Sequence, residues 1–271
     1  MRLVKVATWN VNGIRAREAQ VLAWIEQNPA DVICLQEIKA PAAQVPASLR
    51  DVPGYWGYWH GSKGYSGVAL LVSKALCSKA PVFTHPAFDL ENRIVTASVG
   101  EVTVASVYVP NGGKDFPCKM RFLAALEDYA AGFASTQDTL VVCGDINIAR
   151  AEIDVHPKER RRVIGQLPEE RALFQNLLDK GFIDVGRTLD PTNEGLFTWW
   201  APWRQMRERN IGWRLDYILA SSTLAKSARS CVVSRKTGTS DHAPVIADFA
   251  VDIPTTCGQM TAKLRAVSLG R

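Results

Sequence analysis

The sequence lacks the features that mark secreted, membrane-spanning and zinc-binding proteins. Its six cysteines form no Cys-x-x-Cys pair and no paired spacing with histidine, which argues against a zinc site or a disulfide framework. No apolar run approaches the length that spans a bilayer, and an apolar strand takes the place of a signal peptide at the start. We therefore expect a cytoplasmic protein that makes no contact with a membrane.

Internal repeats, linkers and low-complexity tracts are also missing. The 271 residues are 47% hydrophobic, which is enough to bury a core without help from disulfides or a metal. We therefore expect one domain over residues 1–252, followed by a weakly patterned tail, 253–271, to which we assign no role. The net charge of +5 is compatible with a polyanionic partner, but many proteins carry as much.

The hydrophobic pattern predicts a mixed α/β protein. Helical spacing covers 18–27, 116–133 and 168–180, whereas 55–109 reads as an antiparallel meander of short strands. Both halves offer strands and helices, which favours two sheets packed face to face with helices outside. The predicted strands are Leu3–Trp9, Asp31–Leu35, Tyr55–His60, Val68–Ser73, Pro81–Phe88, Arg93–Val99, Val102–Val109, Leu140–Cys143, Phe182–Val185, Leu196–Trp200, Trp213–Leu219 and Ala243–Val251.

The most informative strand is the apolar run Leu140–Cys143, which ends at Gly144 and is followed by Asp145 and Asn147. A spacing of two in extended chain points both side chains the same way. Ligands of open α/β sheets bind at the carboxyl ends of strands, and this pair suits a phosphate with its attacking water or metal. A plain turn explains Gly-Asp-x-Asn equally well.

Polar side chains end several other predicted strands in the same way. The set is rich in oxygen and contains a single histidine and no thiolate, so it favours Mg²⁺ or Mn²⁺ over zinc. Asp145 is placed to orient or deprotonate a water, and a protonated His242, backed by Asp216, to donate to a phosphate oxygen. The residues are Asn10, Glu37, Tyr108, Asn111, Asp145, Asn147, Asp216, Asp241 and His242.

Two other catalytic patterns are rejected. The glycine-rich segment Gly61–Gly67 lacks the Gly-Lys-Ser/Thr ending of a phosphate loop and opens no helix. Ser240 and His242 lie on no nucleophile elbow, which argues against a serine-hydrolase triad. We interpret His60, His85 and His156 as bystanders.

The segment Phe197–Arg214 combines four tryptophans with four arginines. Arginines neutralise phosphates and indoles stack on bases, so the segment indicates a nucleic-acid surface. The alternative is a set of core tryptophans beside a solvated loop. The residues are Trp199, Trp200, Trp203, Trp213, Arg204, Arg207, Arg209 and Arg214, with a second basic cluster at Lys158, Arg160, Arg161 and Arg162.

Taken in order, the strand-end motifs resemble those of the exonuclease III family of apurinic/apyrimidinic (AP) endonucleases. The resemblance covers about Met1 to Asp252, and the ordered set is far more specific than any one motif. The motifs are Trp9–Arg15, Leu35–Lys39, Gly64–Gly67, Tyr108–Asn111, Gly144–Ala149, Gly212–Tyr217 and Ser240–His242.

This resemblance implies a four-layered α/β sandwich and a Mg²⁺-dependent DNA repair nuclease, with Mn²⁺ as a substitute cation. Members of the family cut 5′ to an abasic site, and many also act as 3′→5′ exonucleases or 3′-phosphatases. The implied partner is double-stranded DNA with abasic sites or blocked 3′ ends. The implied protein is a monomer that acts on the nucleoid in a bacterial cytoplasm.

The resemblance also implies roles for individual residues, with Glu37 as the main metal ligand and Asp216 as the carboxylate behind His242. The implied catalytic residues are Tyr108, Asn111, Asp145, Asn147, Asp216 and His242. The implied metal site comprises Asn10, Glu37, Asp145, Asn147, Asp241 and His242. The implied abasic pocket and DNA contacts are Trp199, Trp213, Leu215, Arg207 and Arg209.

Two departures and several alternatives accompany this interpretation. Asn12 stands where some members carry aspartate, and Trp199 is bulkier than the phenylalanine of some relatives. The alternatives are another phosphodiesterase or phosphomonoesterase of the superfamily, such as an inositol phosphatase or a non-specific DNase, and a non-catalytic DNA-binding relative. The sequence leaves open whether one or two metals act. It also leaves open whether Asp145 is the base or the proton donor to the leaving oxygen.

Overall fold

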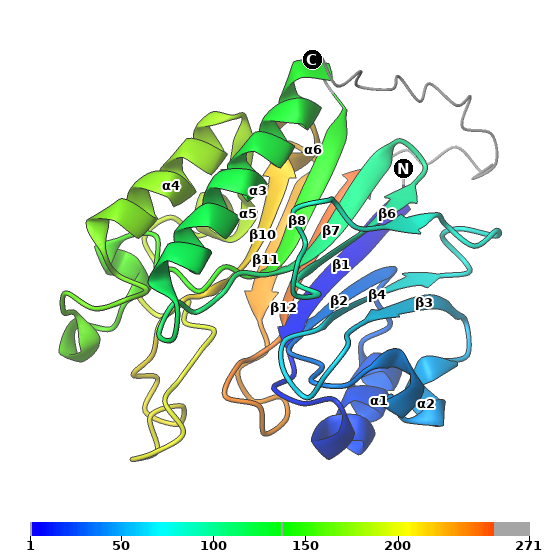
Figure 1. The fold of residues 1–271 in the computed structure, drawn as a ribbon, viewed down its shortest axis with the longest axis horizontal. Helices are drawn as coiled ribbons and strands as arrows, with labels where there is room; N and C mark the ends of the chain where they lie inside the picture. The colour runs from blue at the N-terminus through cyan, green and yellow to red at the C-terminus, as the bar shows by residue number, and fades with distance from the viewer. Residues whose placement is uncertain (1, 137, 252–271) are drawn as a thin grey trace.

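Two six-stranded β-sheets pack face to face in the computed structural model, which describes residues 2–136 and 138–251. Helices cover both outer faces, with the blue and green helices on opposite sides of the sandwich (Figure 1). The expected four-layered α/β sandwich is therefore confirmed. The predicted tail, 253–271, lies outside the described residues, and a single domain over 1–252 stays a prediction.

The first sheet joins the two ends of the described chain. Its strands β1 and β2 are parallel, and every other neighbouring pair in it is antiparallel. The outer face is covered by α1 (Glu18–Gln27) and α2 (Ala47–Arg50). In spatial order the strands are β11 (Ala228–Val233), β12 (Val245–Val251), β1 (Arg2–Asn10), β2 (Val32–Gln36), β4 (Val68–Ser73) and β3 (Tyr55–His60).

The second sheet is built from the middle of the chain. Its one parallel pair is β7 and β8, and its outer face is covered by α3 (Phe116–Thr136) and α4 (Pro168–Asp179). Two short helices, α5 (Val185–Leu189) and α6 (Ser222–Ala225), follow strands. In spatial order the strands are β5 (Phe83–Thr84), β6 (Ile94–Val99), β7 (Val102–Tyr108), β8 (Thr139–Asp145), β10 (Asp216–Ser221) and β9 (Phe182–Asp184).

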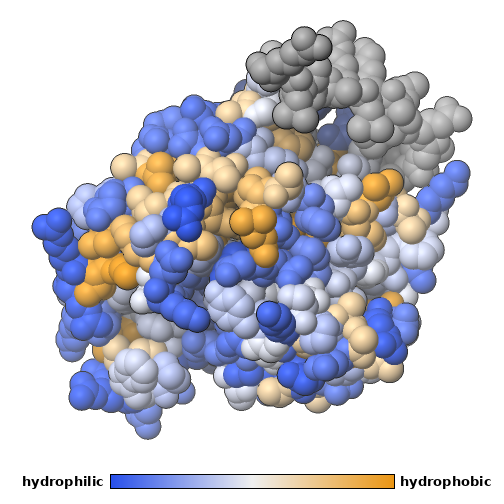
Figure 2. All heavy atoms as spheres, viewed as in Figure 1, coloured by the Kyte–Doolittle hydropathy of each residue, from blue (hydrophilic) through white to orange (hydrophobic). Residues whose placement is uncertain are grey.

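Alternation along the strands divides the apolar residues between the layers. In β8, Val141 and Cys143 belong to the core between the sheets, whereas Leu140 and Val142 pack against the helices. Successive strand residues point to opposite faces, so one strand serves two cores. On the side of the molecule shown in Figure 2, hydrophilic side chains surround separate hydrophobic patches. No helix within 2–136 or 138–251 is both long and apolar enough to cross a bilayer.

Several predicted strands differ from the structure. The expected meander is divided between the sheets, because β3 and β4 join the first sheet and β5 to β7 the second. Pro81–Phe88 forms only the two-residue β5, since Pro81 and Pro86 lack the N–H that a ladder needs. Leu196–Trp200 forms no strand, and its Trp199 makes only isolated bridges. The edge strand β11 was not predicted, because its apolar run, Cys231–Val233, is only three residues long.

Gly144 is the residue in β8 whose replacement we expect to be most damaging. Its φ is 148°, and an added Cβ would overlap the carbonyl oxygen of Val107 on β7. We predict that Gly144→Ala lowers the free energy of unfolding by at least about 2 kcal/mol, measured by urea denaturation with tryptophan fluorescence. The control is Gly132→Ala in α3, where a Cβ meets nothing within 4 Å; it should stabilise by about 0.5–1 kcal/mol. Equal effects would contradict this account.

Candidate active site

Polar side chains gather between the two sheets where strands β1, β2, β7 and β8 end. Asp145 continues the inward-facing series Val141 and Cys143, so the alternation that buries the core also turns this carboxylate toward the opposite sheet. Asp216 begins β10 and pairs with Asp145 across the antiparallel ladder. The site is thus an extension of the inner core in which apolar residues are replaced by polar ones.

Asn10 lies at the centre of this cluster. Its Nδ2 donates to Glu37 Oε1 at 3.0 Å and to Asp145 Oδ2 at 2.9 Å, and lies 3.4 Å from His242 Nε2. Asn10 and Glu37 come from the first sheet, whereas Asp145 comes from the second. One amide therefore connects carboxylates of both sheets.

Glu37 follows β2 in a left-handed conformation, with φ of 50°. Its Oε2 forms an ion pair with Lys39 Nζ at 2.7 Å. Burial alone would raise the pKa of Glu37, but the hydrogen bonds from Asn10 and Lys39 bring it below its ordinary value. The carboxylate is therefore ionised and held at two oxygens. Lys39 lies within a motif noted in the sequence, yet its pairing with Glu37 was not predicted.

Asp145 and Asn147 act as one unit. The backbone N–H of Asn147 donates to Asp145 Oδ1 at 2.9 Å. The side-chain Nδ2 of Asn147 donates to Asp145 Oδ2 at 3.2 Å and to the Val109 carbonyl oxygen at 2.9 Å. Asn147 has φ of 55°, so the chain turns sharply at the residue whose side chain bonds to Asp145. Burial raises the pKa of Asp145 to about 7, with the nearby carboxylates Asp216 and Glu37 adding to the rise and His242 opposing it. This position is therefore a turn and also part of the polar cluster.

His242 is held by Asp216 as predicted. Its Nδ1 lies 2.8 Å from Asp216 Oδ2, and its Nε2 lies 3.8 Å from Asp145 Oδ2. Burial disfavours the imidazolium, but the charges of Asp216 and Asp145 outweigh it and raise the pKa of His242 to about 10. The hydroxyl of Thr198 accepts the backbone N–H of Asp216 at 3.0 Å and so fixes this carboxylate, a contact that the sequence did not reveal.

Asp241 borders the cluster rather than completing it. Its Oδ1 accepts from Asn12 Nδ2 at 2.7 Å, and its Oδ2 accepts from Trp199 Nε1 at 3.0 Å. Burial opposes ionisation, but His242 and these two donors lower the pKa of Asp241. Both oxygens are thus occupied by side chains. Asn12 is a hydrogen-bond donor here, which gives the departure from aspartate a structural role.

Tyr108 is the last residue of β7, whereas Asn111 lies on the loop that follows this strand. Tyr108 is buried, and burial together with the charges of Glu37 and Asp145 raises the pKa of its hydroxyl. The guanidinium of Arg93 lies 4.9 Å from the centre of its ring. Asn111 is exposed, and its Oδ1 accepts the N–H of Gly113 at 2.8 Å. Tyr108 therefore lines the cluster, whereas Asn111 lies on the loop beside it.

The residues predicted for the abasic pocket lie together next to the cluster. Trp199 and Trp213 pack edge to face with ring centroids 5.5 Å apart, and Leu215 joins the same small apolar group with Val155. Trp199 also pairs with His242 through an isolated bridge. This apolar group is thus attached directly to the polar cluster.

The arginines of the aromatic segment have unequal surroundings. Arg207 donates to the carbonyl oxygens of Arg235, Ser240 and Thr237 at 2.5–2.8 Å, so its guanidinium is bound within the protein. Arg214 is buried and makes a two-pronged ion pair with Asp184 at 2.6–2.9 Å. Its expected place on a DNA surface is therefore wrong, because the sequence does not reveal its buried partner.

Arg209 and Trp203, by contrast, are exposed, and the exposed fraction of Trp203 is 60%. Trp203 lines a hollow of about 490 Å³ that also includes Asn12 and Asp241. The aromatic segment therefore supplies both kinds of environment that the sequence left open. Part of it is core, and part is a surface next to the cluster.

The cluster fits a hard divalent cation. Glu37, Asp145 and His242 offer ligand atoms that all lie within 4.8 Å of one another. The other Asp216 oxygen, Oδ1, is buried and has no hydrogen-bond partner among the described residues. Burial is the main cause of the raised pKa of Asp145, and repulsion from Asp216 and Glu37 adds to it. A bound cation would relieve that repulsion. His242 is better suited to donate a proton, because its high pKa keeps Nε2 protonated at neutral pH.

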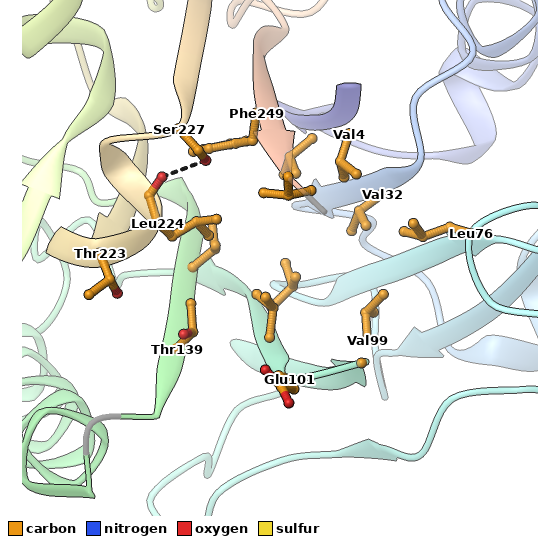
Figure 3. Close-up of a pocket in the computed structure, with 16 residues that line it drawn as sticks. Val4, Val32, Leu76, Val99, Glu101, Thr139, Thr223, Leu224, Ser227 and Phe249 are labelled. Carbon is orange, nitrogen blue, oxygen red and sulfur yellow. Dashed lines mark hydrogen bonds between the residues drawn. The ribbon is translucent and has the colours of Figure 1, made fainter. Parts of the chain in front are cut away.

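Two other features of the described residues resemble binding sites. His60 Nε2 lies 2.6 Å from Asp89 Oδ2, and the His60 ring stacks on that of His85. These three residues could also hold an ion, but they form a group separate from Glu37, Asp145 and His242. An apolar cavity of about 360 Å³ lies at the amino ends of β1, β2 and β8 (Figure 3). Its lining is apolar apart from Glu101 and the hydroxyl groups of Thr139, Thr223 and Ser227, so it offers little to bind a phosphate or a metal.

Known proteins resemble this chain in sequence and in fold. A model of the endonuclease/exonuclease/phosphatase family matches residues 7–242. The chain is 35% identical over 248 residues to an exodeoxyribonuclease of Bacillus subtilis, covering 89% of this chain and 98% of that protein. It resembles the structure of an AP endonuclease from Archaeoglobus fulgidus, with a TM-score of 0.83, 30% identity, and coverage of 92% and 100%. It also resembles the structure of a 3′ phosphatase from Neisseria bound to a product DNA hairpin, with a TM-score of 0.83, 34% identity, and coverage of 92% of this chain and 100% of that chain.

The His242–Asp216 pair leads to a pH prediction for the protein in chelator. The pKa of His242 is raised from about 6.5 to about 10. The stability from its proton is therefore complete below about pH 6.5 and is lost as the pH rises toward 10. Asp216→Asn should lower the pKa of His242 and flatten this loss, measured by NMR titration of the imidazoles and by unfolding at each pH. His156, outside the cluster, is the control. A wild-type His242 that titrates near 6.5 would contradict the prediction.

Proposed function

Since this chain belongs to the endonuclease/exonuclease/phosphatase family, we propose that it is a DNA repair nuclease that hydrolyses the phosphodiester bond 5′ to abasic sites. The observation that carries the proposal is that a polar cluster and an apolar group lie next to each other. The polar cluster around Asn10, Glu37 and Asp145 borders the apolar group of Trp213 and Leu215. A phosphodiester could occupy the first while the sugar next to it occupies the second.

Magnesium is the proposed cofactor, with Mn²⁺ as a substitute. When bound, the cation would neutralise the phosphate and stabilise the charge that develops on phosphoryl transfer. Glu37 is the proposed main ligand, because it is ionised and lies at the edge of the cluster with a side chain that is 16% exposed. Asn10, Asp145, Asn147, Asp241 and His242 were also predicted as ligands. Of these, Asp241 and His242 are better suited to support the site than to bind the cation. Both Asp241 oxygens already accept hydrogen bonds, and His242 is protonated at neutral pH.

The chain's own residues supply the remaining chemistry. With a pKa of about 7, Asp145 exchanges a proton near neutral pH, which suits either a base for the attacking water or a donor to the leaving oxygen. Asn147 fixes the orientation of Asp145. His242, held through Nδ1 by Asp216, donates from Nε2 to a phosphate oxygen. Tyr108 supplies a hydroxyl whose raised pKa keeps it a donor, and Asn111 supports the phosphate from its loop.

The apolar group provides the proposed selectivity. Trp199, Trp213 and Leu215 would accept a flipped abasic sugar and exclude a nucleotide with its base, because flipping an abasic site loses little stacking. Trp199 is held in place by its bond to Asp241, so its bulk is fixed at the rim. Arg209 is exposed and available for a phosphate, whereas Arg207 would contact DNA only while keeping its bonds to three carbonyl oxygens.

The related proteins suggest further activities of the same site. Relatives carry the names exodeoxyribonuclease and 3′ phosphatase, and we extend to this chain 3′→5′ exonuclease and 3′-phosphatase activity on blocked 3′ ends. Double-stranded DNA is the proposed partner, and the protein is proposed to act as a monomer. Since one of these relatives is bacterial, we place the activity in a bacterial cytoplasm, at the nucleoid.

The proposal is tested by incision of a duplex that contains one abasic site. We predict cleavage with Mg²⁺, none in chelator, and recovery on adding Mg²⁺ or Mn²⁺. Glu37→Gln keeps the shape but removes the charge, and should raise the Mg²⁺ concentration needed for half-maximal rate at least about tenfold. The matched control is Glu101→Gln, an exposed carboxylate at the opposite end of the sandwich. Hydrolysis of an inositol phosphate with no DNA cleavage would select the alternative within the superfamily, and DNA binding without cleavage the non-catalytic one.

The pocket is tested by Trp213→Ala. Loss of the indole opens the apolar group, so the ratio of abasic incision to exonuclease cleavage of undamaged DNA should fall at least about tenfold. Both rates are measured on matched duplexes that differ only in the abasic site. Trp203→Ala, which removes an exposed tryptophan outside this apolar group, is the comparison. Equal losses of both activities in Trp213→Ala would remove the basis for the pocket.

A further inference from the structure

Lys119 is a buried cation that the proposed chemistry does not use. It lies in α3, and its side chain and that of Glu170 in α4 both have no exposed surface. Their ammonium and carboxylate form an ion pair. The spacing Lys119, Leu123, Leu126, Ala130 places this lysine on the buried stripe of the helix, a signal that the sequence contains.

The amine reaches both loops that carry predicted catalytic residues. Lys119 Nζ donates to the backbone carbonyl oxygen of Asn147 at 2.8 Å and to that of Asn111 at 3.3 Å. The first loop follows β8 and the second follows β7. One side chain therefore connects two segments whose side chains, in the proposed function, orient Asp145 and support the phosphate.

Glu170 continues the same network on the other side. Its Oε2 accepts the N–H groups of Gly165 and Leu167 at 2.7 and 3.0 Å, which fixes the start of α4. The carbonyl oxygen of Gly165 in turn accepts the N–H of Ala149 at 2.8 Å, two residues after Asn147. The ion pair thus holds α3, α4 and both loops around one buried point.

Stability alone does not explain this arrangement. Removing two charges from water is costly, and well-packed apolar residues often replace a buried ion pair with no loss of stability. An apolar pair could not donate to two carbonyl oxygens, however. We propose that Lys119, balanced by Glu170, is a positioning residue that sets the separation of the Asn111 and Asn147 loops for catalysis. This inference rests on the proposed nuclease function.

The test uses the double variant Lys119→Met/Glu170→Gln in the full chain. Methionine keeps an unbranched stem without the amine, and glutamine keeps an oxygen for the start of α4. We expect the single-turnover rate of abasic incision to fall about 100-fold with the Kd for DNA unchanged, since small displacements of reacting groups cost this much. Amide exchange at residues 111–113 and 147–149 should become faster, which reports on the loops independently of activity.

Two companion variants separate positioning from stability. Leu126→Ala lies two turns along the same buried stripe and should lower the melting temperature while leaving the incision rate intact at a permissive temperature. Lys119→Arg can still donate to both carbonyl oxygens and should recover part of the rate. This second variant also keeps the question answerable if the double variant fails to fold.

The outcomes separate the two proposals. A double variant with wild-type incision and unchanged amide exchange would overturn the positioning role, as would equal losses of rate in the double variant and Leu126→Ala. A wild-type protein that fails to cut abasic DNA would overturn the proposed function instead. In that case the exchange experiment alone decides whether Lys119 holds the loops.

Discussion

The hydrogen bonds of one amide, Asn10 Nδ2, connect the carboxylates of two different sheets, Glu37 at 3.0 Å and Asp145 at 2.9 Å. Without this donor, negative groups from opposing strand ends would face one another across a buried gap. The remaining charge is balanced by Lys39 and His242, each within 2.8 Å of a carboxylate oxygen. Burial, and after it the charges of Asp216 and Glu37, raise the pKa of Asp145, and a bound cation would stabilise the ionised carboxylates.

Much of this cluster was predictable because strand geometry is periodic. In β8 the residues 141, 143 and 145 share one face, so a buried strand that ends in aspartate must direct that carboxylate into the sandwich. The same rule places Asn10 at the end of β1 and Tyr108 at the end of β7. The layered architecture followed from the same apolar pattern, and helix α1 has the predicted bounds.

What could not be predicted depends on which partner a side chain meets. Arg214 and Arg209 look alike in the sequence, yet one is buried against Asp184 and the other is exposed. The partner of Arg214 is 30 residues away, and no local spacing reveals it. The division of the meander between the sheets has a similar cause, because short strands such as β5 pair through non-local contacts that periodicity does not specify. Thr198 contributes only through its bond to the Asp216 backbone, which needs coordinates to be seen.

The site itself is a strained part of a well-packed protein. Four residues of the site have a positive φ of 46° to 55°, namely Asn12, Glu37, Lys39 and Asn147. Residues other than glycine adopt this backbone conformation at a cost in free energy. Such strain persists only where surrounding contacts determine the backbone, and here these contacts are polar and buried. The ion pair of Lys119 with Glu170 lies directly behind Asn147. A structure that keeps charge and strain at one end of the sandwich therefore depends for its stability on the apolar cores between the sheets and under the helices.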